Sequence, residues 1–258
     1  MNLKTGIVTA LSRELHTLTD SPLRKGEVRE LSDGYYVCLS GVGKKAARKA
    51  GQKLIKSGVN LIISWGTAAS LHQDLKTGTL VIPKRIITSK NDTITTDEAV
   101  RRQIVKLIPD HLNYSDGNLC TADFLLTESA QKISLGMKRN SVAADMESGV
   151  LAELCSKKNI PFVVIRSISD SSAMVIPTSV TKNMNSKSDI NIFPFLRSAI
   201  VRPDEWLPIF RLAKGFGRAK KSLSEAAKCL FPVLLQNLSQ FEDEIFQKNK
   251  RSLEKTDY

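Results

Sequence analysis

The stretches VAADMESGVLAEL (142–154) and IPFVVIRSISD (160–170) together decide the fold. The first reads as the end of a strand that leads into a helix, with Glu147 at the junction. The second is a continuous apolar run that ends at Asp170, and such runs are typical of strands buried on both faces. In sheets of this kind, functional side chains gather at the carboxyl ends of the strands. The two acids are therefore predicted to face a common crevice.

Four more apolar runs have the same character. They are TGIVTAL, YYVCL, VNLIISWG and TGTLVIPKRII, at residues 5–11, 35–39, 59–66 and 77–87. Between the second and the third, residues 40–58 read as a turn and then a helix that Gly58 ends. Buried strands that alternate with helices predict an α/β layered fold with a parallel or mixed sheet.

The chain has 258 residues, 41% hydrophobic and 25% charged, which suits one large domain or one domain with an appendage. No stretch approaches the roughly 18 consecutive apolar residues that cross a bilayer, and the N-terminal apolar run is too short for a signal peptide. Four scattered cysteines and three histidines favour neither disulfides nor a zinc site. We therefore expect a reduced, cytoplasmic protein without a bound metal.

The net charge of +12 favours an anionic partner, which can be nucleic acid, a membrane surface or a phosphorylated ligand. No zinc motif, helix-turn-helix signature or aromatic platform accompanies the charge, so we expect no nucleic acid as a partner. The choice between the other two depends on where the charges lie.

The C-terminal part differs from the rest, and we expect a catalytic domain over 1–200 and a helical extension over 201–258. From Ile209 onward, apolar or small residues recur three and four positions apart, as on one face of a helix. Six cations and one acid occupy residues 211–228. Such a basic amphipathic helix can lie in a membrane interface, or it can dock on the core with solvated lysines. The sequence leaves both arrangements open.

The segment 171–195 breaks the pattern of strands and helices. It is rich in Ser, Asn and Thr, contains two prolines and has little periodicity. Long segments of this kind are often functional. Because it follows Asp170 directly, it fits a lid over the crevice, and an exposed connector fits equally well.

Five motifs resemble, in this order, the signatures of the nucleoside phosphorylase and nucleosidase superfamily. They are GIVTALSRE, SGVGKKAA, ISWGTAASL, AADMESGVLAELC and IPFVVIRSISD. The resemblance covers most of residues 5–170 and implies a three-layer α/β/α fold with a central mixed sheet, cleavage of a glycosidic bond, and a homo-oligomer. The glutamate at Glu14 is a feature shared with the methylthioadenosine/S-adenosylhomocysteine nucleosidases.

The run FLRSAIVRPDEWLPIFRLAKGFGRAKKSL (195–223) resembles the tail of the hopanoid-associated nucleoside phosphorylases. This implies a lipid-linked adenine nucleoside, adenosylhopane, as the substrate, and an enzyme that lies at the inner face of an anionic membrane. Two alternatives stay open. One is a nucleosidase for small soluble nucleosides, and the other is a basic protein that binds nucleic acid or membrane without turnover.

The resemblance also implies roles for individual residues. Asp170 would be the general acid that protonates N7 of the purine, with Ser169 orienting it. Glu147 would be ionised, would accept hydrogen bonds from the ribose hydroxyls and would favour the cationic sugar of the transition state. Met146 would lie against the ribose, and Glu14 would be the base that activates a water. Each acid also has a structural interpretation, as a helix cap or a first-turn acid.

Two further residues are expected at the substrate. Thr67 keeps a hydroxyl in GTAAS, where many nucleosidases read GSAGG, but the missing glycines put a close backbone approach there in doubt. Leu126, in CTADFLLT (120–127), is expected in the base pocket.

The nucleophile stays open between water and phosphate, which is the one co-substrate we consider. Phosphorylases commonly place an arginine just before the strand-end pair, where this chain has Ser64 and Trp65. Three cations remain as donors to a phosphate, namely Arg13, Lys44 and Arg166. The loop between Gly41 and Gly43 is a weak phosphate-binding signal, which a tight turn also explains.

Overall fold

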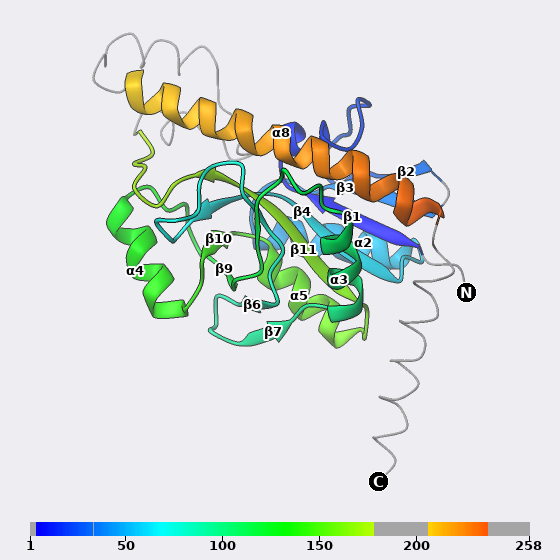
Figure 1. Cartoon of the computed structure of the whole chain (residues 1–258). Coiled ribbons are helices and arrows are strands. Elements are labelled where there is room, and N and C mark those ends of the chain that lie inside the picture. The colour runs from blue at the N-terminus through cyan, green and yellow to red at the C-terminus, as the bar shows by residue number, and fades with distance from the viewer. Residues whose placement is uncertain (1–3, 33, 178–205, 237–258) are drawn as a thin grey trace.

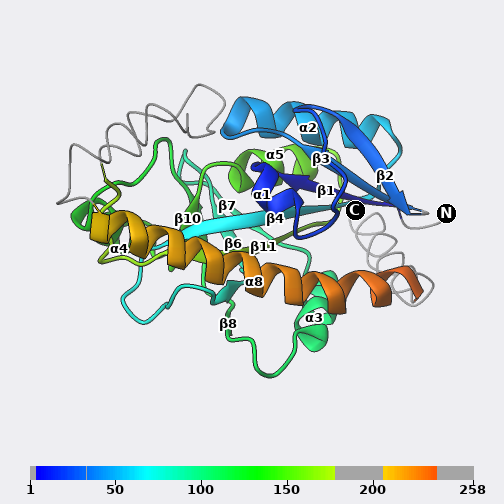
Figure 2. The same cartoon turned by 90° about the horizontal axis from the view of Figure 1, so that it is seen from above.

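The computed structural model describes residues 4–32, 34–177 and 206–236. Most of the predicted lid segment and the proposed boundary at residue 200 lie outside these ranges. In the described chain, one mixed sheet is covered by helices on both faces (Figures 1 and 2). This agrees with the predicted α/β layers.

The sheet is organised around its longest strand, β4 (Leu61–Ser70). This strand pairs in parallel with β1 and β11 and antiparallel with β10. The other strands of the described chain extend the sheet on both sides. Their bounds are β1 (Thr5–Thr9), β2 (Val28–Ser32), β3 (Tyr35–Leu39), β5 (Leu80–Val81), β6 (Arg85–Ile87), β7 (Thr93–Thr95), β8 (Tyr114–Ser115), β9 (Leu119–Thr121), β10 (Ala143–Asp145) and β11 (Phe162–Asp170).

Successive residues of the central strands enter two separate cores. Ile7 and Ile63 pack with α3 and α8 on one face, whereas Val8 and Ile62 pack with α2 and α5 on the other. This is the physical reason for continuous apolar runs in the sequence, because neither face of the strand meets water. The helices are α1 (Ser12–Leu15), α2 (Lys44–Lys56), α3 (Glu98–Leu107), α4 (Ser129–Arg139), α5 (Ser148–Lys157) and α8 (Trp206–Gln236).

The prediction of one strand over 77–87 was wrong. The segment forms two short strands, β5 and β6, with Pro83 between them. Proline has no backbone N–H to give to a sheet ladder, so the chain leaves one partner and joins another. β5 pairs with β11, and β6 pairs with β9.

The long helix α8 docks on the sheet, which is one of the two arrangements that the sequence left open for the basic tail. Its apolar face is fully buried at Ala219, Leu223, Ala226 and Leu230, which follow the predicted spacing. The beginning of the helix is exposed. Within the described chain, no helix is long and apolar enough to cross a membrane.

Gly215 lets α8 pass close to the end of β11. A Cβ atom on Gly215 would lie 2.2 Å from the carbonyl oxygen of Ser169, which no real side chain tolerates. At Gly217, one half-turn further on, nothing lies within 4 Å of such an atom. Gly215 is therefore required by the close packing of α8 on Ser169, although glycine is unfavourable inside a helix.

We expect Gly215→Ala to destabilise the protein and Gly217→Ala to stabilise it. Alanine is the better helix former by about 1 kcal/mol, and at Gly217 this gain is free of any clash. At Gly215 the added methyl overpacks the contact with β11, which costs roughly 1–3 kcal/mol. Urea unfolding of both variants measures the difference, and equal stabilities would contradict the close approach.

Candidate active site

Arg166, in the middle of β11, is the centre of a buried polar cluster. Its Nη2 atom lies 2.6 Å from Asp145 Oδ2 and 3.9 Å from Glu147 Oε2. The same nitrogen donates hydrogen bonds to the hydroxyls of Ser64 (2.8 Å) and Ser148 (3.2 Å). Burial lowers the pKa of this guanidinium, but the neighbouring carboxylates outweigh that effect and raise it. A permanent positive charge therefore joins β4, β10, β11 and α5.

Glu147 lies between β10 and α5 and is 7% exposed. Its Oε1 atom accepts a hydrogen bond from Gly43 N (2.7 Å), and Oε2 accepts one from Met146 N (3.3 Å). Burial and the charge of Asp145 raise the pKa of Glu147 to about 7, against the opposing effect of Arg166. The ionised form that was expected is therefore the major form only above neutral pH in the ligand-free protein.

Glu14 is held by four protein donors. Its Oε2 atom accepts hydrogen bonds from the backbone N–H groups of Ala10 (3.1 Å) and Leu11 (3.0 Å). Its Oε1 atom accepts from Thr67 N (2.8 Å) and Thr67 Oγ1 (2.9 Å). A carboxylate has about four acceptor positions, so all of them are in use here. Glu14 thereby caps α1 and also ties it to the end of β4.

Gly66 allows the acid and the arginine to approach β4. A Cβ atom at Gly66 would lie 2.6 Å from Glu14 Oε1 and 2.4 Å from Arg166 Nη1. Both charged groups therefore occupy the space that a side chain would fill. Since Arg166 also reaches Glu147, the two glutamates lie on either side of one cation.

Asp170 ends β11 and is paired with a buried lysine. Lys132 Nζ, on α4, lies 2.5 Å from Asp170 Oδ2. The other oxygen, Oδ1, accepts a hydrogen bond from Ser169 Oγ (2.8 Å). Ser169 Oγ also lies 3.3 Å from the carbonyl oxygen of Ala68 on β4. Asp170 thus has a fixed orientation and an adjacent positive charge.

The remaining predicted substrate residues lie at different depths. Thr67 is half-buried beside Glu14, and Met146 is half-buried beside Glu147. Leu126 is buried in a small apolar cluster with five other residues, namely Leu71, Ile87, Cys120, Ala122 and Ala144. Its side chain therefore packs into the protein in the ligand-free structure, while the adjacent Phe124 is exposed.

The three cations considered as phosphate donors all have other partners. Arg166 is enclosed by the carboxylates described above. Lys44 forms an ion pair with Asp123, and Arg13 lies over the ring of Phe216 at 5.8 Å. In the described chain, only Arg166 of the three is enclosed by carboxylates, whereas Lys44 and Arg13 have a single partner each.

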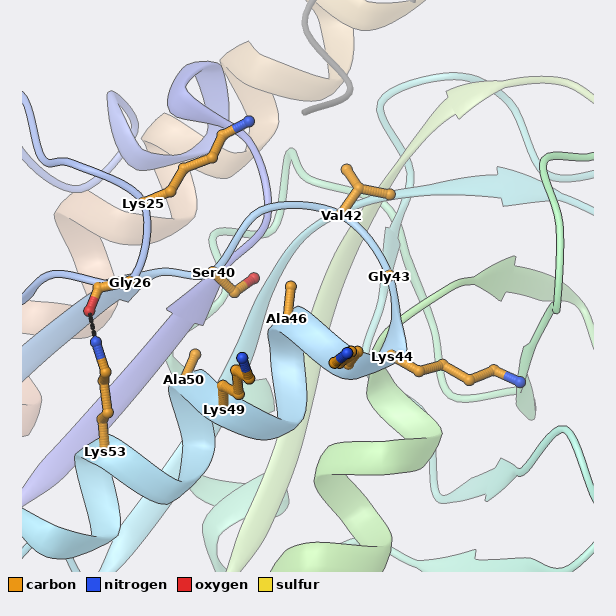
Figure 3. A pocket seen from close by; sticks show the side chains of 11 residues that line it. Lys25, Gly26, Ser40, Val42, Gly43, Lys44, Ala46, Lys49, Ala50 and Lys53 are labelled. Atoms are coloured by element: carbon orange, nitrogen blue, oxygen red, sulfur yellow. Dashed lines mark hydrogen bonds between the residues drawn. The ribbon is translucent and has the colours of Figure 1, made fainter. Parts of the chain in front are cut away.

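A basic pocket borders the site at Gly43. Its volume is about 540 Å³, and it lies between the loop around Gly26 and the exposed face of α2 (Figure 3). Figure 3 shows Lys53 reaching the carbonyl of Gly26, while Lys44 extends away along the other side of Gly43. Five lysines line the pocket, at positions 25, 44, 45, 49 and 53. The first turn of α2 has no acid, so cations stand at the positive end of the helix.

The sequence did not indicate the roles of two residues in this site. No role was expected for Asp145, but its carboxylate accepts a hydrogen bond from Ser148 N (3.1 Å) at the start of α5 and forms an ion pair with Arg166. Lys132 carried no signal at all, because a lysine in a helical pattern is normally exposed. An arginine inside an otherwise apolar strand was the one available sign that Arg166 has buried partners.

Comparison with known proteins shows the family to which this chain belongs. The model for "Phosphorylase superfamily" matches residues 4–188. A 5'-methylthioadenosine/S-adenosylhomocysteine nucleosidase of Buchnera aphidicola is 28% identical in an alignment 202 residues long that covers 66% of this chain and 79% of that protein. The nucleosidase of the same name from Staphylococcus epidermidis is 24% identical over 77% of this chain and 91% of its own.

Solved structures share the fold. The Helicobacter pylori nucleosidase of that name, with butyl-thio-DADMe-Immucillin-A, has a TM-score of 0.65 and 19% identity, covering 92% of this chain and 99% of its own. Futalosine hydrolase of the same organism has a TM-score of 0.63 and 20% identity, covering 88% and 98%. Since the family model spans most of its length, the chain belongs to the phosphorylase superfamily, and it is an enzyme that cleaves the glycosyl bond of nucleosides.

Proposed function

We propose that this enzyme cleaves the N-glycosidic bond of an adenine nucleoside by hydrolysis and releases adenine. The observation that carries the proposal is the pair of buried carboxyl groups at two strand ends, Glu147 and Asp170, which have different surroundings. Glu147 lies in a cluster with a second acid, Asp145, and with Arg166, whereas Asp170 lies directly against a lysine and a serine hydroxyl. Two carboxyl groups in different environments are suited to different roles in one reaction.

Asp170 is the general acid of the proposed reaction. When the bond between C1′ of the sugar and N9 of the purine breaks, its electron pair moves into the base, and protonation at N7 makes the base a better leaving group. Ser169 and Lys132 hold both oxygens of Asp170 in place. A positioned acid of this kind contributes about 10²–10⁴-fold to a rate.

Glu147 binds the sugar. In its ionised form it accepts hydrogen bonds from ribose hydroxyls, and its negative charge favours the positive charge that develops on the sugar. The N–H groups of Gly43 and Met146 hold its two oxygens, which fixes the direction of the carboxylate. Met146 itself supplies an apolar contact to the ribose.

Water is the proposed nucleophile, with Glu14 as its base. The three candidate donors for a phosphate have other partners, which favours water. For a water to reach Glu14, one of its four donors must give way. The hydroxyl of Thr67 is suited to this because it can rotate, whereas the three backbone N–H groups cannot.

We further propose that the substrate is a nucleoside linked to a lipid. Exposed apolar side chains at the beginning of α8, Trp206, Leu207 and Phe210, support it, because they offer an apolar surface with Arg211 and Lys214 close by in the helix. Within the described part of α8, the exposed large apolar side chains are found at this end of the helix. The relatives named as methylthioadenosine/S-adenosylhomocysteine nucleosidases favour the alternative of a small soluble nucleoside.

The substrate and the nucleophile are tested together by the release of free adenine from adenosylhopane, methylthioadenosine and adenosine, each with and without phosphate. We expect release that is independent of phosphate. Turnover of the lipid-linked substrate alone supports the finer proposal, and comparable turnover of the small nucleosides supports a general nucleosidase. Release that requires phosphate would show that the proposed nucleophile is wrong.

Asp170→Asn is expected to reduce the rate of adenine release by about 10²–10⁴-fold, because the N–H groups of an amide are far too weakly acidic to transfer a proton to N7. Binding of a nonhydrolysable nucleoside analogue should stay within a few-fold of the original value. The exposed Asp74→Asn is the matched control and should retain full activity. A fully active Asp170→Asn enzyme would eliminate this residue as the acid.

The pKa of Glu147 predicts the acidic limb of the pH profile. Because the pKa is raised to about 7, protonation removes the charge that binds the sugar as the pH falls through that value. We expect kcat/KM, which reports the free enzyme, to be higher at pH 8 than at pH 6 and to fall about tenfold per unit well below 7. Glu147→Gln should lower kcat/KM at pH 8 and abolish this limb. A limb that persists in the variant would assign it to another group.

A further inference from the structure

Lys132 is a fully buried lysine with three hydrogen-bond acceptors. Its Nζ atom donates to Asp170 Oδ2 (2.5 Å), to the carbonyl oxygen of Met174 (2.8 Å) and to the carbonyl oxygen of Ser171 (3.1 Å). An ammonium group has three N–H donors, so each of them has a partner. The side chain is 0% exposed, and Asp170 is 6% exposed, so the pair meets little water.

We infer that Lys132 is the source of the proton that Asp170 gives to the leaving base. The inference rests on the proposed function and deepens it, because it names how the acid is kept supplied with a proton. Lys132 touches Asp170 and not the substrate, so it is a positioning residue that acts through the carboxyl group. Two carbonyls fix the ammonium, and the third N–H is aimed at the acid.

The hydrogen bonds allow this transfer without rearrangement. When the proton moves from Nζ to Oδ2, the neutral amine keeps two N–H groups for the carbonyls of Ser171 and Met174. Its new lone pair then accepts a hydrogen bond from the Asp170 carboxylic acid. The low dielectric of a buried site also favours two neutral groups over two charges, compared with the same pair in water.

Every proton in the proposed reaction has a source and a destination. The Asp170 carboxylic acid gives its proton to N7 as the C1′–N9 bond breaks and the electron pair of that bond enters the purine. Water adds to C1′ and loses a proton to Glu14. Asp170 is left as a carboxylate beside a neutral Lys132, and the pair regains one proton while Glu14 returns one to the solvent. The net change is nucleoside plus water to sugar plus adenine.

Sharing of one proton predicts a specific effect of pH. With Lys132 present, Asp170 takes its proton from the adjacent ammonium group, and this supply does not depend directly on the proton concentration of the solvent. With Lys132→Met, Asp170 must take its proton from the solvent, and the proton concentration there falls tenfold per pH unit. The ion pair recorded at this position in the described chain joins Lys132 and Asp170, and the helix that packs on the neighbouring Ser169 carries the cations Lys214 and Arg218.

The experiment compares kcat of the unmodified enzyme and of Lys132→Met from pH 5 to pH 9 with the same nucleoside. We expect the ratio of the two kcat values to rise toward tenfold per pH unit on the alkaline side. Any titration of Glu147 affects both enzymes and cancels in the ratio. The exposed Lys138→Met on the same helix is the matched control, with an expected ratio of one throughout. A ratio independent of pH would reduce Lys132 to a structural role and overturn the inference.

Lys132→Arg provides a second test that does not depend on the stability of the methionine variant. Arginine retains the positive charge and can donate to the same acceptors, but it cannot release a proton in a protein. We expect KM within about threefold of the original value and kcat reduced by at least tenfold. Full kcat in this variant would show that charge and position suffice, which contradicts proton supply.

Asp170→Asn separates this inference from the proposed function. An inactive Asp170→Asn enzyme together with a flat Lys132→Met ratio leaves the acid assignment standing and rejects only the proton source. An active Asp170→Asn enzyme rejects both.

Discussion

The site depends on a positive charge that is buried inside the sheet. Arg166 is 2% exposed, and a charge at this depth is tolerated only where carboxylates and hydroxyls surround it. Asp145 and Glu147 come from β10 and the start of α5 and Glu14 comes from α1, so the arginine brings together segments that are distant in the sequence. Loss of one partner from such a pair commonly costs about 3–5 kcal/mol. Two of the acids in the proposed reaction, Glu147 and Glu14, thus lie beside the same charge that joins the strands.

A second constraint comes from the opposite side of the sheet, where α8 crosses the end of β11. The helix has no side chain at Gly215, so it packs directly on the carbonyl of Ser169, the residue before the proposed acid. Further along, Phe231 contacts the rings of Tyr35 (6.0 Å between centroids) and Trp65 (5.5 Å). The C-terminal helix therefore forms part of the wall behind the active site and is not an independent appendage in the described chain.

The sequence predicted the strands with the longest apolar runs and the acids at their ends, because these features are local. β1, β3 and β11 appear where continuous hydrophobic residues predicted them, and Asp170 stands at the predicted strand end. Partners that depend on tertiary packing were not predictable. Lys132 is buried only because α4 brings it to the end of β11, and no periodicity records that contact. A glycine is unfavourable inside a helix, and only the packing of Gly215 over Ser169 explains its presence there.

The lysines of α2 are expected to make the stability of this helix depend on ionic strength. Lys45, Lys49 and Lys53 are four residues apart on one exposed face, and like charges at this spacing destabilise a helix. At physiological ionic strength the screening length is about 8 Å, so added salt weakens this repulsion while the buried pairs of Arg166 and Lys132 are affected much less. Moderate salt should thus stabilise α2 in the ligand-free protein. A bound polyanion would relieve the same repulsion more locally, and its effect would diminish as the salt concentration rises.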